Sequence, residues 1–221
     1  IAFEVSYRIN QVTPISSTSL VTFALLDNDD CSITLEQGRA ILRPLLDYIA
    51  IRGLPLTPDV DLSDTGGVAE ALANLVREGV VSRYDAGLDP VFAISDDRQH
   101  EAGFYRNTVI HFFITRAIVE VALVKMGEED AADVSAATWD YCKQLRDILK
   151  YEFFFPSTRE FAESVEREVA IVRPNWEAER GDFGEGYSLV DRRGQDYIAQ
   201  GAVAPAPAFY WRTTRDGRTF A

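Results

Sequence analysis

An apolar run follows a cluster of hydroxyl residues early in the chain. After Pro14, the hydroxyl cluster Ser16–Ser19 precedes an apolar run from Leu20 to Leu26. Hydroxyl side chains of this kind cap the free N–H groups of a first helical turn, and proline fits just before it. We therefore predict a short buried helix within Val12–Leu26, followed by a polar loop at Asp27–Asp30.

Two more helices are predicted before residue 80. Thr34 followed by Gln37 matches a capping box, and Gly53 is a suitable C-cap for the apolar, helix-spaced segment between them. Pro44 lies inside this segment and predicts a kink. The apolar residues of Thr65–Gly79 again share one helical face.

The helical spacing of apolar residues is interrupted at about residues 80–94 and returns after them. Val80–Tyr84 and Pro90–Ile94 flank a five-residue turn that contains a glycine, which predicts a β-hairpin. Phe104–Met126 is the most apolar segment, but charged residues interrupt it, so we predict a central buried helix rather than a membrane span. Amphipathic helices are expected over Asp130–Glu152 and from a second capping box at Ser157 to about Val172.

These elements predict a mainly α fold of about six or seven helices with one small β-hairpin, about residues 80–94. We assign residues 1–176 to one helical domain. Residues 177–221 are rich in glycine, proline and charge, and we expect an irregular or weakly packed tail there. The first residue is Ile1 rather than methionine, which we interpret as a fragment of a longer polypeptide.

Charge limits the possible partners. The 35 acidic and 22 basic residues give a net charge of −13, which repels phosphate backbones and anionic lipid headgroups. We therefore expect no nucleic-acid partner, and membrane contact that is peripheral and local at most. The two cysteines and two histidines form no ligand-spaced cluster, so no metal is expected, and no cofactor is predicted.

No self-sufficient active site is found. In a His-x-x-x-x-Asp acyltransferase motif, the carboxylate that orients the histidine lies five positions after it. Five positions after His100 is Tyr105, and five after His111 is Arg116. The motif is absent, as are the GxSxG elbow, the P-loop and a strand-linked GxGxxG. We therefore assign no catalytic residue.

Polar residues inside the apolar segment are the remaining candidates. Asn107 and His111 lie four residues apart on one helical face, and Arg116 and Glu120 form an oppositely charged pair at the same spacing. Burying such groups is costly unless each is paired. They form a polar network that fixes helix packing, face a neighbouring domain or a phosphate-bearing ligand, or face solvent. The candidates are Tyr105, Arg106, Asn107, His111, Arg116 and Glu120.

Three consecutive aromatic residues, Phe153–Phe155, cannot all point the same way. They either fill the core at a helix end or form an apolar patch that touches a membrane or an acyl chain.

Three blocks resemble one family in order and spacing. Phe104–Phe113 resembles the Tyr-Tyr-Arg-Asn-x-x-x-His-x-Phe segment that follows the catalytic domain of bacterial glycerol-3-phosphate acyltransferases. Arg8–Leu26 resembles that family's Ile-Asn segment and the Leu/Ala-rich helix after it, and Leu145–Pro156 resembles its Leu-Leu-Lys-x-Glu-Phe-Phe-Phe-Pro segment. The resemblance covers roughly residues 1–173, and the chain departs from the family's pattern after about Trp176.

The resemblance implies the C-terminal portion of an enzyme that transfers an acyl group from acyl-CoA or acyl carrier protein to glycerol 3-phosphate. It implies no cofactor and a peripheral location at the cytoplasmic face of the cell membrane. The main partner would be the catalytic acyltransferase domain of the same polypeptide, so the isolated chain is predicted to be inactive. The alternatives are a non-catalytic regulatory or scaffolding module that binds a protein partner, and a winged-helix regulator, which the acidic charge disfavours.

Overall fold

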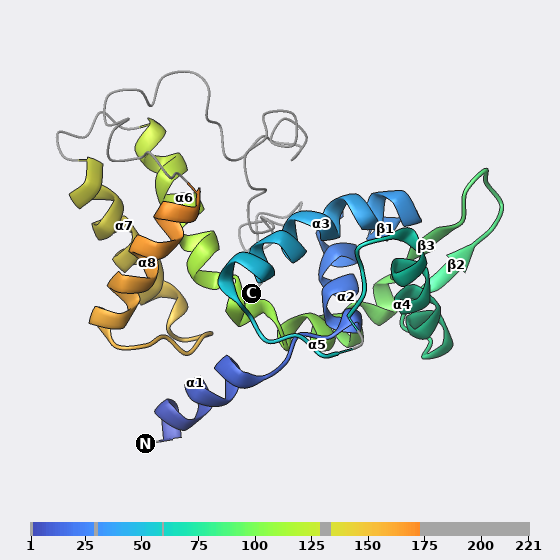
Figure 1. Cartoon of the computed structure of the whole chain (residues 1–221), viewed down its shortest axis with the longest axis horizontal. Coiled ribbons are helices and arrows are strands. Elements are labelled where there is room, and N and C mark those ends of the chain that lie inside the picture. The colour runs from blue at the N-terminus through green and yellow to red at the C-terminus, as the bar shows by residue number, and fades with distance from the viewer. Residues whose placement is uncertain (1, 29–30, 59, 129–133, 173–221) are drawn as a thin grey trace. The chain divides into compact units, whose positions relative to one another are not determined.

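The computed structural model describes residues 2–28, 31–58, 60–128 and 134–172 (Figure 1). These residues fall into two compact units. One unit is Ile9–Phe112, and the other comprises the described parts of Ile1–Arg8 and Phe113–Ala221. The predicted mainly helical fold with a small hairpin is confirmed, whereas the predicted tail, 177–221, lies outside the described residues.

The described residues form eight α-helices, three short strands and two 3-10 turns. The helices are α1 (Ala2–Val12), α2 (Ser17–Asp27), α3 (Leu35–Arg52), α4 (Thr65–Arg77), α5 (Gln99–Asn107), α6 (Ile114–Glu128), α7 (Val134–Leu149) and α8 (Thr158–Val172). The strands are β1 (Ser32–Ile33), β2 (Ser82–Tyr84) and β3 (Val91–Ala93), and the 3-10 turns are Asp96–Arg98 and Ile110–Phe112.

Helix α2 is the core of the unit Ile9–Phe112. It is buried from Ser19 to Leu25, and α3, α4 and α5 pack around it. A helix that is apolar on every side must be covered on every side. Ser16 and Ser19 form a capping box at its start, and the Thr22 hydroxyl donates to the Thr18 carbonyl (2.9 Å), so its buried hydroxyls are satisfied.

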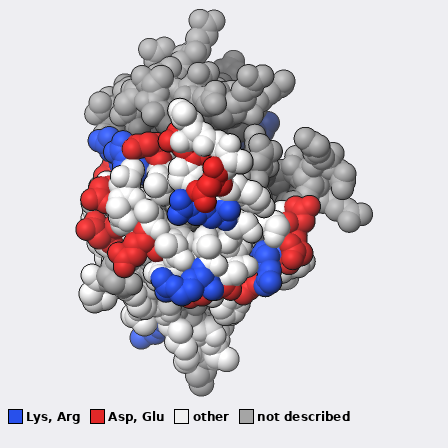
Figure 2. Space-filling view, turned by 90° about the vertical axis from the view of Figure 1, so that its right-hand side faces the viewer, with Lys and Arg blue, Asp and Glu red and all other residues white. Residues whose placement is uncertain are grey.

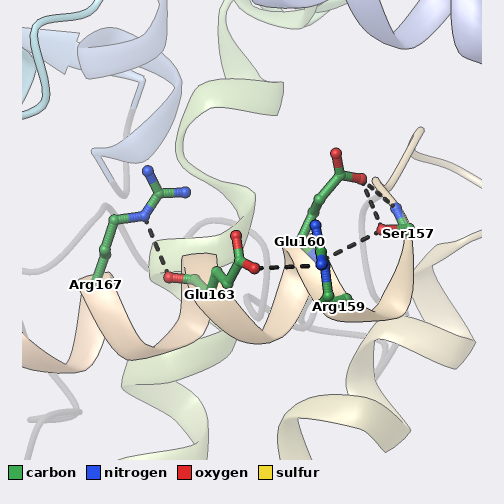
Figure 3. A network of polar contacts seen from close by, with 5 residues as sticks. All are labelled: Ser157, Arg159, Glu160, Glu163 and Arg167. Carbon is green, nitrogen blue, oxygen red and sulfur yellow. Dashed lines mark hydrogen bonds and ion pairs between the residues drawn. The ribbon is translucent and has the colours of Figure 1, made fainter.

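The predicted caps of α3 and α8 are confirmed. Thr34 and Gln37 cap each other's backbone N–H groups, and Gly53 ends α3 in the left-handed conformation, with φ of 60°. Helix α3 runs without a break through Pro44. At the start of α8, the Ser157 N–H donates to the Glu160 carboxylate (3.1 Å), and the Glu160 N–H donates back to the Ser157 hydroxyl (3.4 Å) (Figure 3).

The hairpin is confirmed and has a third strand that was not predicted. Strand β3 pairs with β2 and with β1 in an antiparallel sheet of order β1-β3-β2, which places Ile33 opposite Phe92. Both side chains are buried. Strand β1 is only two residues long, so it is too short to show a period in the sequence.

The prediction of one central helix over Phe104–Met126 is wrong. Helix α5 ends at Asn107, and α6 begins at Ile114. Between them the Val109 N–H donates to the Arg106 carbonyl (3.0 Å), and the Thr108 hydroxyl donates to the Tyr105 carbonyl (2.7 Å), so three-residue bonds replace the helical ladder. The boundary between the two units falls in the same stretch, after Phe112.

In the other unit, α6 packs against α7 and α8. Its buried residues include Ile118, Ala122 and Met126, and α8 contributes Phe161 and Val165. The predicted start of α7 at Asp130 lies outside the described residues, and α7 is described from Val134. Within the described residues, no helix has the length and apolar character needed to cross a membrane.

At the start of α4, Gly67 lies very close to the backbone of Asp61. A Cβ atom there would lie 1.6 Å from the Asp61 carbonyl oxygen, whereas at Gly66 it would meet only the Asp64 side chain, at 3.1 Å. We expect Gly67→Ala to lower the free energy of unfolding by about 3 kcal/mol and Gly66→Ala by less than about 1 kcal/mol. Denaturant unfolding measures both, and equal values would contradict this close approach.

Candidate functional site

Three of the six candidates lie at the C-terminal end of α5. The Tyr105 hydroxyl donates to the carboxylate of Glu78, the C-cap of α4, at 3.3 Å. Desolvation, followed by the charge of Glu78, raises the pKa of Tyr105, so the phenol stays protonated and acts as a donor. The Arg106 guanidinium donates twice to the Asn107 side-chain oxygen, at 3.2 and 3.0 Å. Glu78 lies 27 residues from Tyr105, and no sequence pattern pointed to it.

Phe104 gives this end of α5 an apolar component. Its side chain is 70% exposed and meets Tyr105 edge-on, with ring centroids 6.0 Å apart. An exposed Phe beside a Tyr and an Arg has the composition of a protein-protein hot spot. We call Phe104, Tyr105, Arg106 and Asn107 the α5 end surface.

His111 has a structural role. Its Nε2–H donates to the Asn10 backbone carbonyl in the last turn of α1, with 2.7 Å between the two heavy atoms. A bond to this carbonyl requires the proton on Nε2, so that nitrogen is not available as a base. Burial lowers the pKa of His111 below 6.5, and the bond to Asn10 opposes the shift. The imidazole is therefore neutral near pH 7 and satisfies a helix-end carbonyl.

Arg116 and Glu120 belong to the other unit, where they form an ion pair on α6. Arg116 is 1% exposed and Glu120 6%, and the Arg116 Nε donates to the Glu120 carboxylate. This agrees with the polar-network interpretation for these two residues. Glu168 of α8 is also fully buried in this unit, which the sequence analysis did not identify.

Phe155 and Phe154 differ in burial. Phe155 is 3% exposed and lies in the core, where its ring meets Phe161 edge-on at 5.6 Å. Phe154 is 43% exposed and contacts Phe3 of α1. One aromatic residue therefore fills the core, and another contributes to the surface.

Cys142 is buried, and the possible metal ligands among the described residues do not cluster. Burial raises the pKa of the Cys142 thiol to about 12, so the reactive thiolate does not form near neutral pH. No group of three or more His, Cys, Asp or Glu side chains among the described residues is placed to hold a metal ion. On the face shown in Figure 2, acidic and basic side chains are interspersed rather than gathered into one basic surface.

Comparison with known proteins identifies the class. The family model for the glycerol-3-phosphate acyltransferase C-terminal region matches residues 1–212. The chain therefore belongs to this family, as its three sequence blocks indicated. The predicted end of the resemblance, at about Trp176, is too early, because the match extends to residue 212.

Individual relatives of the chain are named as acyltransferases, in agreement with the family match. The chain is 39% identical over 174 residues to "Putative acyltransferase plsB1" of Mycobacterium tuberculosis and, equally, of Mycobacterium bovis. The match covers 78% of the chain and 28% of the relative. A glycerol-3-phosphate acyltransferase of Shewanella oneidensis is 24% identical over 160 residues, 70% of the chain and 18% of that protein. The chain thus spans less than a third of the length of these relatives, and the comparisons do not favour the regulatory or scaffolding alternative.

The ion pair on α6 can be tested by removing one partner. We expect Arg116→Leu to lower the free energy of unfolding by about 3–5 kcal/mol, because it leaves a buried carboxylate without this cation. The double variant Arg116→Leu with Glu120→Leu should recover much of this loss. The control is Arg159→Leu, which removes the exposed pair with Glu163 at the same spacing, 3.6 Å apart (Figure 3), and should cost less than about 1 kcal/mol. Equal losses for Arg116→Leu and Arg159→Leu in denaturant unfolding would contradict the assignment.

The neutral His111 predicts a pH dependence of stability. Because its folded-state pKa lies below the ordinary 6.5, the unfolded chain takes up the proton first as the pH falls. Stability should therefore decrease as the pH drops through 6.5, by at most about 1.4 kcal/mol per pH unit from this group, until the folded-state pKa is reached. His111→Gln, which cannot titrate, should remove this component from unfolding curves. His100→Gln, a change at an exposed histidine, should retain it, and an unchanged slope in His111→Gln would refute the mechanism.

Proposed function

We propose that this chain is the supporting C-terminal portion of a glycerol-3-phosphate acyltransferase. In the whole polypeptide, a separate domain with a His-x-x-x-x-Asp motif transfers an acyl group from acyl-CoA or acyl carrier protein to glycerol 3-phosphate. The observation that carries the proposal is the family match over residues 1–212. The relatives are longer than the matched segment, which is consistent with a companion catalytic domain.

The absence of the His-x-x-x-x-Asp motif supports a non-catalytic role for the chain itself. Neither histidine is followed five positions later by a carboxylate, and the Nε2 of His111 is bound to the Asn10 carbonyl. A histidine that deprotonates the acceptor hydroxyl in this enzyme class needs an orienting carboxylate, and neither histidine has one at the required spacing. The isolated chain is therefore expected to transfer no acyl group.

The α5 end surface is proposed to contact the catalytic domain. Tyr105 and Arg106 are each held by a hydrogen bond, to Glu78 and Asn107, so they are partly ordered before a partner arrives. Phe104 supplies exposed apolar area beside them. An apolar anchor flanked by ordered polar donors suits a protein interface better than a small-molecule site.

The polypeptide is proposed to act at the cytoplasmic face of the cell membrane as a peripheral protein, as its family resemblance implies. The charge of −13 makes contact between this chain and anionic lipid unfavourable. Membrane contact would therefore be made mainly by another part of the polypeptide.

A chimera tests this function. This chain would replace the matched 174-residue segment of the M. tuberculosis relative, and acyl transfer to glycerol 3-phosphate would be measured. We expect the chimera to transfer acyl groups. Arg106→Ala should lower its rate of transfer by about tenfold or more and leave the melting temperature of the isolated chain unchanged. Arg39→Ala is the control, because Arg39 is an exposed arginine paired with Glu36 at 3.1 Å on another helix. A folded chimera without acyl transfer would contradict the proposed function. Equal effects of the two substitutions would contradict the proposed contact between the α5 end surface and the catalytic domain.

A further inference from the structure

Helix α1 carries apolar side chains on two opposite faces. Phe3 and Tyr7 lie four residues apart on one face. Val5, Ile9 and Val12 are spaced by four and three residues and form a second row. The two rows are offset by two positions, which is about 200° around a helix. We call Val5, Ile9 and Val12 the outer row of α1, and the sequence analysis did not identify it.

The first face packs against the described structure, and the outer row is largely exposed. The Phe3 ring packs edge-on against Phe154, with centroids 5.1 Å apart and an interplanar angle of 78°. On the outer row, Val5 is 50% exposed, Ile9 57% and Val12 73%. No residue of α1 is buried by the described part of the chain.

A helix of this kind needs a second partner. An 11-residue helix is marginally stable in water, and helices of this length owe their stability mostly to packing of an apolar face. The spacing of the outer row, four and then three residues, is that of the apolar seam between two packed helices. The composition of the row, two valines and an isoleucine, fits such a seam.

We propose that the outer row of α1 is the surface on which the preceding, catalytic part of the polypeptide packs, through a helix of its own with an apolar seam. This inference rests on the proposed function. In the relatives, the matched segment is 28% of the length and corresponds to the family's C-terminal region, so most of each relative precedes it. Helix α1 opens the described chain and is the element next to that part.

Covalent linkage makes a small surface sufficient. A stable dimer of two free chains buries about 800 Å² on each partner, far more than three aliphatic side chains supply. A domain on the same polypeptide has an effective concentration in the millimolar range, so a much smaller contact can hold it.

The charge pattern of α1 disfavours a lipid surface. Helices that lie on membranes are rich in Lys and Arg and carry Trp, Phe or Leu on the buried face. The ionised residues of α1 are Glu4 and Arg8, which pair with each other at 2.7 Å and leave no net charge. The outer row contains no aromatic residue.

The test compares two isoleucines of equal exposure. Ile9 on α1 and Ile51 on α3 are each 57% exposed, so Ile9→Gln and Ile51→Gln are matched changes. In the isolated chain, neither substitution should shift the midpoint of denaturant unfolding beyond the error of the measurement. In the chimera with the M. tuberculosis relative, the backbone amides of α1 should exchange with solvent at least about tenfold more slowly than in the isolated chain. Ile9→Gln should abolish this added protection and lower acyl transfer, and Ile51→Gln should do neither.

The outcomes separate this inference from the function. The inference is overturned if the chimera is active but its α1 amides gain no protection, or if both substitutions have the same effect. Neither result contradicts the proposed function. An inactive chimera counts against the function. Concentration-dependent dimerisation of the isolated chain that Ile9→Gln abolishes would assign the row to a second copy. Binding to phosphatidylglycerol vesicles that Ile9→Gln abolishes would assign it to lipid, and either result overturns the inference.

Discussion

The structure of the unit Ile9–Phe112 depends on the burial of α2. This helix is apolar on every side, and it becomes stable only when α3, α4 and α5 cover it. Because the apolar surface of α2 must be covered, the apolar face of each surrounding helix packs toward α2. The last turn of α5, with Phe104 and Asn107, remains exposed, which makes it available to a partner.

Several polar groups near the core are bonded within the fold or kept neutral by burial. His111 satisfies a carbonyl at the end of α1, and Arg116 and Glu120 neutralise each other on α6. The Cys142 thiol is protonated because it is buried. These contacts fit the supporting role that we propose for the chain.

Features that depend on residues close in sequence are more predictable than those that depend on residues far apart. The caps at Thr34, Gly53 and Ser157 involve residues close in sequence, so their chemistry could be recognised directly. The bond between His111 and Asn10 could not, because it joins positions 101 residues apart. The pair of Arg116 and Glu120 was predicted from its spacing, but whether it faced core or solvent depended on how α6 packs on α7 and α8.

The central claim is that this chain supports an acyltransferase without containing its active site. The most direct test is to supply the chain as a separate polypeptide to the M. tuberculosis relative truncated before the matched segment. Transfer of an acyl group to glycerol 3-phosphate would be measured for each component and for the mixture. We expect little transfer by either component alone and restored transfer by the mixture. Transfer by the isolated chain, or full activity of the truncated relative without it, would contradict the account.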